Sequence, residues 1–398
     1  MERLQSSVVR TPPNSTVVQR RSKSYRQSYR SCLGAPSRLG LTPGLTARRL
    51  NSSRRALKSH VITVSHTNPS LTIFYVLLNL QRETLNGHVF YPVLFLLKEK
   101  VNPEHLALLV KTEWRLSYVT PLHQFRHTQL KRYSRQLSAF IAAEKQQGVA
   151  MEVEGSQSGF RVSFSVVQGL AATDDDAETV LIQIYSTPVF ARQDEPQKSV
   201  WSGWLTCING NPEYLESLPK GFTCLPLFGG SGAEVLTSLV KSWFQRTFDC
   251  CFGPLEINHT SLQWLAALWT NCHTESNLQH LKMIWTLPVV PPLQVTYTVN
   301  PQDAWELWMS VRKDRLERTE EEAEAGSIDI EEVVRFVQGL KSHFYRHFRL
   351  DLSAGNLNQV STTLGSAKSS GKIKISNSRY MITTLTLLTE CALLKMPI

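Results

Sequence analysis

The sequence lacks the features of a secreted, disulfide-bonded protein. Its 398 residues include seven cysteines, and their odd number and irregular spacing give no disulfide framework. Arg3 and Arg10 flank no apolar segment of the kind found at the centre of a secretory signal. We therefore expect a reducing compartment, in which the cysteines behave as small apolar core residues.

Hydrophobic runs long enough to cross a bilayer are also lacking. Two apolar runs, Leu71–Leu80 and Val89–Leu97, are separated by a charged stretch, and each is shorter than the roughly 20 residues of a spanning helix. We therefore expect no membrane partner. The segment 61–98 is nevertheless an atypical apolar insert, and two hypotheses for it stay open. One is a re-entrant or membrane-surface segment. The other is a retained intron in the gene model, because a splice tract that is read through encodes Phe, Leu, Pro and Val; abundant peptides from 71–97 would refute it.

Acidic residues are almost missing from the first 60 residues, which hold thirteen Lys and Arg but only one acid, Glu2. The rest of the chain carries nearly equal numbers of both signs, so the net charge of +10 belongs to the tail. With no regular hydrophobic period, residues 1–60 are predicted to be a disordered basic tail. Two clusters in it fit nuclear import or contact with a polyanion: Arg20, Arg21 and Lys23, and Arg48, Arg49, Arg54 and Arg55.

A mitochondrial presequence is the alternative interpretation of this tail, since such segments are also rich in Arg and Ser and poor in acids. Pro12 and Pro13 argue against it, because they interrupt an amphipathic helix early.

From residue 99 onward the patterns are those of a globular body. The residues Ser231 and Glu234 have the spacing of a capping box and predict a helix that continues to about Cys250. Alternation predicts strands over 149–154, 160–166, 180–185, 200–208, 293–299, 357–364 and 371–376. Helical spacing predicts helices over 104–114, 127–147, 260–270, 276–286, 301–311, 329–348 and 380–394.

The order of these elements favours an α+β fold, with mostly antiparallel sheets and packed helices, preceded by the disordered basic tail. We divide the body into an N-terminal lobe, 99–290, and a C-terminal lobe, 291–398, which carries a sheet for pairing with a partner.

Glycine-rich and histidine motifs give no support for an enzyme. Gly229–Gly232 precedes a predicted helix but lacks the Lys-Ser/Thr of a phosphate-binding loop. His343 and His347 have the spacing of a zinc protease motif, but no glutamate lies between them. Asp174–Asp176 lacks the spacing of a calcium loop.

The remaining candidate is a zinc site, because five residues of suitable type lie close in sequence. None of them forms a C-x-x-C pair, and a set of core thiols is the simpler interpretation. We predict no catalytic residue, no cofactor and no metal. The five residues are Cys250, Cys251, His259, Cys272 and His273.

Several segments, taken in order, resemble one known family. They are 114–125 (WRLSYVTPLHQF), 130–153 (LKRYSRQLSAFIAAEKQQGVAMEV), 222–228 (FTCLPLF), 243–258 (WFQRTFDCCFGPLEIN), 262–270 (LQWLAALWT), 342–354 (SHFYRHFRLDLSA) and 371–375 (GKIKI). No single segment is a chemical signature, but the ordered set closely resembles the centromere protein L family, subunits of the constitutive inner-kinetochore network. The likeness runs from about residue 98 to residue 394.

The resemblance implies a non-enzymatic function in the nucleus, at the centromere and kinetochore of the chromosome. Family members pair with centromere protein N through sheet surfaces in their C-terminal halves. The pair docks with centromere protein C and with centromere proteins H, I, K and M. Together they help hold the centromeric nucleosome and its DNA for chromosome segregation. This chain departs from the family pattern at 61–97 and in an acidic stretch around 315–327.

A strand edge in the C-terminal half could accept a partner strand, because backbone hydrogen bonds supply the pairing. In the two candidate strands, alternate apolar residues would be buried on one face. These residues are Val295, Tyr297 and Val299 in one strand, and Ile373 and Ile375 in the other.

Two groups of basic residues are candidates for proximity to DNA, one at a helix end and one on a strand. The alternative for the strand lysines is that they protect a sheet edge against aggregation. The two groups are Lys341, Arg346 and Arg349, and Lys372, Lys374 and Arg379.

A function of another class stays open beside the scaffold. The chain could be a stand-alone nuclear nucleic-acid-binding protein that acts through its basic N-terminal arm. Removal of residues 1–60 separates the two hypotheses, because only the arm hypothesis requires that binding is then lost.

Overall fold

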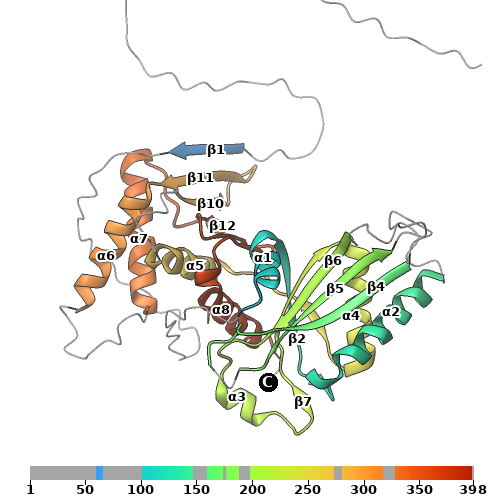
Figure 1. Ribbon diagram of the computed structural model, residues 1–398. Coiled ribbons are helices and arrows are strands. Elements are labelled where there is room, and N and C mark those ends of the chain that lie inside the picture. The colour runs from blue at the N-terminus through green and yellow to red at the C-terminus, as the bar shows by residue number, and fades with distance from the viewer. Residues whose placement is uncertain are drawn as a thin grey trace, which may run out of the picture. The chain divides into compact units, whose positions relative to one another are not determined.

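Most strands of the body join one twelve-stranded sheet. The computed structural model describes residues 60–65, 101–146, 159–173, 176–187, 198–272, 280–316 and 328–396. In this part of the chain the strand order is β1-β11-β10-β12-β13-β14-β2-β8-β6-β5-β4, with β9 paired to β2 (Figure 1). The strands are β1 (His60–Ser65), β2 (Glu113–Val119), β4 (Gly159–Val167), β5 (Thr179–Thr187), β6 (Lys198–Thr206), β8 (Leu227–Gly232), β9 (Phe252–Pro254), β10 (Leu281–Leu287), β11 (Leu293–Val299), β12 (Asn356–Ser361), β13 (Gly365–Lys368) and β14 (Lys372–Ile375).

The remaining elements are helices and one small second sheet. The second sheet pairs β3 (Leu122–His123) with β7 (Phe222–Thr223). The α-helices are α1 (Pro103–Lys111), α2 (Leu130–Gln146), α3 (Pro212–Ser217), α4 (Glu234–Phe248), α5 (His259–Asn271), α6 (Pro301–Leu316), α7 (Ile330–Phe348) and α8 (Met381–Leu393).

Two hydrophobic cores lie on this sheet. The first packs α2 and α4 against β4, β5, β6 and β8, and aromatic side chains such as Tyr133, Phe164 and Trp243 fill it. The second and larger core packs α5, α7 and α8 against β10 to β14, around Trp285 and Tyr297. The helix α5 and the strand β10, which precede residue 290, contribute to this second core.

The two halves of the sheet carry their helices on opposite faces. The register places Arg115 opposite Gly230, Gly230 opposite Gly203 and Gly203 opposite Ile182, so these four positions share one face. Ile182 packs in the core with α2 and α4, whereas Arg115 is exposed. Between β10 and β2 this face therefore reaches solvent around Arg115, whereas Ser117 further along β2 is buried beside Lys241 of α4.

The predicted α+β class with a mostly antiparallel sheet is confirmed, and β1 with β11 is a parallel pair. The helix predicted over 104–114 ends at Lys111, because Glu113 and Trp114 belong to β2. Two further local predictions were wrong. The helix predicted over 276–286 is replaced in the described residues by the strand β10, Leu281–Leu287. Ser231 does not cap a helix, because it lies in β8; α4 begins at Glu234 after Ala233, whose side chain makes no capping bond. Residues 1–59 lie outside the described part of the chain, as do 149–154.

The described helices differ from a membrane-spanning helix, which needs about 20 mostly apolar residues. In this part of the chain, none combines the length and apolarity that a membrane-spanning helix requires.

Candidate functional site

The strand β11 holds the first group of predicted partner-strand residues. Val295, Tyr297 and Val299 alternate along it and are all buried in the larger core. The Tyr297 hydroxyl lies 2.6 Å from Nδ1 of His343 in α7, and the Tyr297 ring packs edge-on against Phe344. These side chains therefore fix β11 to α7, and any further strand would meet β11 through its backbone.

The second group of predicted partner-strand residues lies in the interior of the sheet. Ile373 and Ile375 are buried in β14, which pairs with β13 on one side and with β2 on the other. An added strand finds no free edge there. Of the two candidate strands, β11 is the one near an end of the sheet, and β1 pairs with its outer side.

The opposite end of the sheet is covered by a helix. The last strand there, β4, lies under α2. The Ser134 hydroxyl accepts a hydrogen bond from the N–H of Phe164 at 3.0 Å, and the Ser138 hydroxyl donates one to the carbonyl of Phe160 at 2.9 Å. Side chains of α2 thus satisfy backbone groups that an exposed edge strand would offer to another chain.

A row of basic side chains lies on the sheet face that carries Arg115. The register aligns Lys368 with Lys372 and Lys372 with Arg115 across three neighbouring strands. A second row runs from Lys282 through two serines to Lys374. All five side chains reach solvent at least in part. We call this set, Lys282, Lys368, Lys372, Lys374 and Arg115, the basic sheet face.

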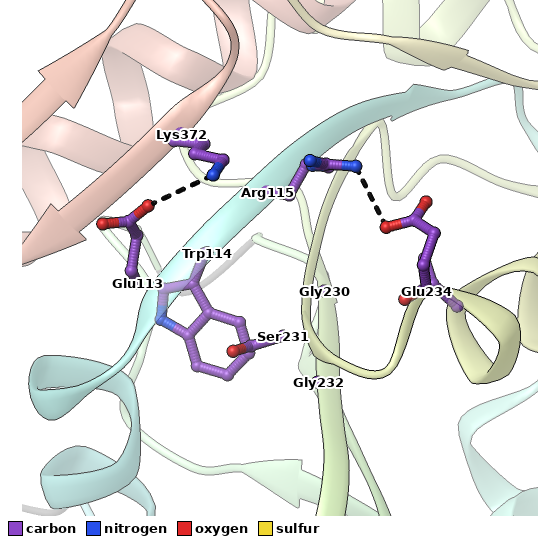
Figure 2. A pocket seen from close by; sticks show the side chains of 9 residues that line it. Glu113, Trp114, Arg115, Gly230, Ser231, Gly232, Glu234 and Lys372 are labelled. Carbon is purple, nitrogen blue, oxygen red and sulfur yellow. Dashed lines mark hydrogen bonds and ion pairs between the residues drawn. The ribbon is translucent and has the colours of Figure 1, made fainter. Parts of the chain in front are cut away.

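A small polar cavity of about 170 Å³ lies where the basic sheet face meets the first turn of α4. Figure 2 shows Arg115 directed toward Glu234 and Lys372 directed toward Glu113. The Arg115–Glu234 pair spans 3.0 Å, and Glu113 lies 3.8 Å from the Lys372 ammonium and 3.6 Å from that of Lys368. These side chains are about half exposed, so the pairs contribute little stability and can rearrange for another anion.

The predicted basic residues do not form one patch. Lys341 in α7 is half-buried, and its ammonium lies 5.2 Å from the ring centroid of Trp285, on the helix-covered side of the sheet. Burial lowers the pKa of Lys341 below its ordinary value. Arg346 and Arg349 are exposed at the end of α7, and Arg379 is exposed beside the ring of Tyr380. Only Lys372 and Lys374 of this set belong to the basic sheet face.

Sequence patterns missed three residues of the basic sheet face. Lys282 lies in a stretch that we predicted to be a helix, and Lys368 ends β13, beyond the strand that we predicted over 357–364. Arg115 aligns with them only through the pairing of β14 with β2. The alternation of lysine and isoleucine in Lys372–Ile375 predicted correctly that Lys372 and Lys374 lie on one face of β14, but it gave no information about the neighbouring strands.

The two buried cysteines of the supposed zinc set, Cys250 and Cys272, lie in different cores. Cys250 belongs to the first core and Cys272 to the second, and burial raises the pKa of each to about 12. Such thiols stay protonated near neutral pH. The described residues contain no group of three metal-ligating side chains, and His273 lies outside them.

The other supposed sites serve the fold. Gly229–Gly232 is part of β8, and a Cβ at Gly229 would lie 2.4 Å from the ring of Trp204. Asp176 accepts hydrogen bonds from the backbone of Ala172 and Asn209 and holds the loop. Asp174, Asp175 and the tail clusters lie outside the described residues.

Comparison with known proteins finds a matching family model and similar curated proteins. The family model described as Centromere protein L matches residues 108–393. Centromere protein L of Danio rerio is 55% identical over 392 residues, which cover 98% of this chain and 94% of that protein. Centromere protein L of Homo sapiens is 42% identical over 298 residues, covering 75% of this chain and 83% of that protein.

Proposed function

The chain belongs to the centromere protein L family, and we propose that it is a non-enzymatic structural subunit of the inner kinetochore. In this proposal it acts in the nucleus, on the centromere of the chromosome. It forms a heterodimer with centromere protein N and docks with centromere protein C and centromere proteins H, I, K and M. The complex helps anchor the kinetochore on centromeric nucleosomes and DNA for chromosome segregation.

One observation carries the proposal of strand pairing: the contrast between the two ends of the sheet. At one end, serines of α2 satisfy the backbone of β4. At the other end, β11 is held by a core contact to α7, and its outer side pairs with the six-residue strand β1. A strand that is fixed on its inner face but lacks a covering helix along its backbone suits β-augmentation by a partner.

The basic sheet face supports the proposal of proximity to DNA. Lysine, arginine and serine side chains on one sheet surface match the groups that usually contact phosphate and sugar oxygens. Glu113 and Glu234 are the acids that pair with these cations in the cavity, and their pairing is weak enough for phosphate to replace it. We propose that Lys282, Lys368, Lys372, Lys374 and Arg115 contact the DNA backbone without reading its sequence.

The test of the scaffold function is co-expression with centromere protein N, followed by sizing chromatography. We expect the full chain and a chain that lacks residues 1–59 to elute with centromere protein N in equal stoichiometry. A body that stays monomeric beside a folded centromere protein N contradicts the scaffold.

The same pair of chains tests the alternative, a nucleic-acid-binding protein that acts through its basic arm. The thirteen Lys and Arg of residues 1–60 favour it. It predicts that removal of 1–59 abolishes DNA binding, and that binding by the full chain falls steeply with salt through counterion release.

A further inference from the structure

The edge of β11 is occupied by a segment from the start of the chain. The strand β1 lies parallel to β11, with His60 opposite Leu293 and Ser65 opposite Thr298. Figure 1 shows β1, in blue, alongside β11 at the end of the row formed by β11, β10 and β12. The strand that we propose as the docking edge therefore already has a neighbour from its own chain.

The sequence of β1 suits this position. It reads HVITVS, in which Val61, Ile62, Thr63 and Val64 are all β-branched and favour a strand. The segment contains no Lys, Arg, Asp or Glu, although Arg54 and Arg55 precede it closely. This uncharged stretch can thus pair as a strand directly after a strongly basic tail.

The pairing of β1 has the features of a replaceable contact. A parallel pair is slightly less stable per residue than an antiparallel one. The strand has six residues, and β11 is its partner in the sheet. Residues 66–100 separate it from the rest of the body, so its pairing costs a loop-closure entropy that neighbouring strands in a hairpin avoid.

We propose that His60–Ser65 is a resident strand that holds the edge of β11 in the free chain and leaves it when a partner strand binds. This inference rests on the proposed function, because it assumes that the partner uses the β11 edge. A resident strand that holds the edge about 90% of the time lowers the apparent affinity for the partner about tenfold. It also shields an edge that would otherwise pair with other copies.

The test begins with the free full-length chain and does not need the partner. Residues 60–65 are replaced by Gly-Ser-Gly-Ser-Gly-Ser, which preserves the length of the tether. The matched control replaces residues 14–19 (NSTVVQ), another neutral six-residue segment with two valines, in the same way. Hydrogen exchange is then followed in peptides from β11 and, as a check of folding, from β5.

We expect the outward-facing amides of β11 to exchange about tenfold faster in the 60–65 variant, with no change in the control variant. The β5 amides should keep their protection in both variants. Unchanged exchange of β11 in the 60–65 variant overturns the inference, whether or not the heterodimer forms.

A titration with recombinant centromere protein N gives the second readout. Loss of β1 should tighten binding about tenfold, because the partner no longer competes with a resident strand. Weaker or equal binding overturns the inference, since β1 would then belong to the partner interface or lie outside it. If neither variant nor the original chain binds, the proposed function fails, while the exchange experiment still decides whether β1 holds the edge.

Discussion

Tyr297 shows at the scale of one residue how the docking strand is held. It is fully buried, and burial raises the pKa of its phenol above the ordinary value. The hydroxyl therefore stays protonated near neutral pH and can donate to Nδ1 of His343 across 2.6 Å. A hydrogen bond between β11 and α7 in a dry environment fixes the strand against its helix, which leaves its backbone in a defined position for pairing.

We predict that Tyr297→Phe lowers the free energy of unfolding by about 1–2 kcal/mol, because it removes a buried hydrogen bond and leaves the ring packing in place. The measurement is the midpoint of urea unfolding at an unchanged m-value. Tyr345→Phe is the matched control, since Tyr345 is on the same helix as His343 and is 49% exposed. Its change should stay within about 0.5 kcal/mol. Equal effects of the two substitutions would refute the role of Tyr297 in holding β11.

At the scale of elements, periodicity predicted most helices correctly but could not settle every strand. The sequence Leu281–Leu287 satisfies two periods at once. Leu281, Ile284 and Trp285 have helical spacing, while Leu281, Met283 and Trp285 alternate. The segment forms a strand because it pairs with β11 and β12. Periodicity within the segment cannot reveal these partners, since they lie outside it in the sequence.

Glycines misled the prediction at β8 for a similar reason. Gly229–Gly232 resembles a turn before a helix, but it is a central strand between β2 and β6. Glycine is required at Gly229 because the Trp204 ring occupies the space of its Cβ. A local sequence pattern cannot reveal an aromatic ring that belongs to another strand.

The position of β14 was also beyond local patterns. It lies inside the sheet because it pairs with β2, which is far away in the sequence, so Ile373 and Ile375 are not edge residues.

The basic sheet face yields a prediction about DNA. Replacing Lys368, Lys372 and Lys374 together by Gln should lower the affinity for duplex DNA at least about tenfold at about 0.1 M salt. It should also reduce the slope of log K against log salt by about 0.9 for each phosphate that the variant no longer neutralises. Fluorescence anisotropy across a salt series measures both quantities. Stability should change little, because the ion pairs of these lysines are half-exposed.

The matched control for that experiment replaces three exposed basic residues of α2, Lys131, Arg132 and Arg135, by Gln. Both triple variants lose the same charge and keep the basic tail. If they lower affinity equally, net charge alone accounts for binding and the basic sheet face has no special part.

At the scale of the whole molecule, the charge is divided unevenly between tail and body. The first 60 residues carry the excess positive charge, and the body is nearly neutral. One sheet runs through the body and offers two different surfaces, the edge of β11, where β1 pairs, and a basic face across β10 to β2. We propose that the edge pairs with protein and that the basic face lies toward DNA, so a single sheet connects the two kinds of partner.

The hydrogen-exchange footprint of centromere protein N on the full chain tests this division of roles most directly. We predict that peptides covering 293–299 exchange still more slowly in the complex than in the free chain, while peptides covering the α2-covered strand at 159–167 do not change. A footprint on 159–167, or a complex in which exchange at 293–299 is unchanged, would contradict the claim that the chain works by offering the edge of β11.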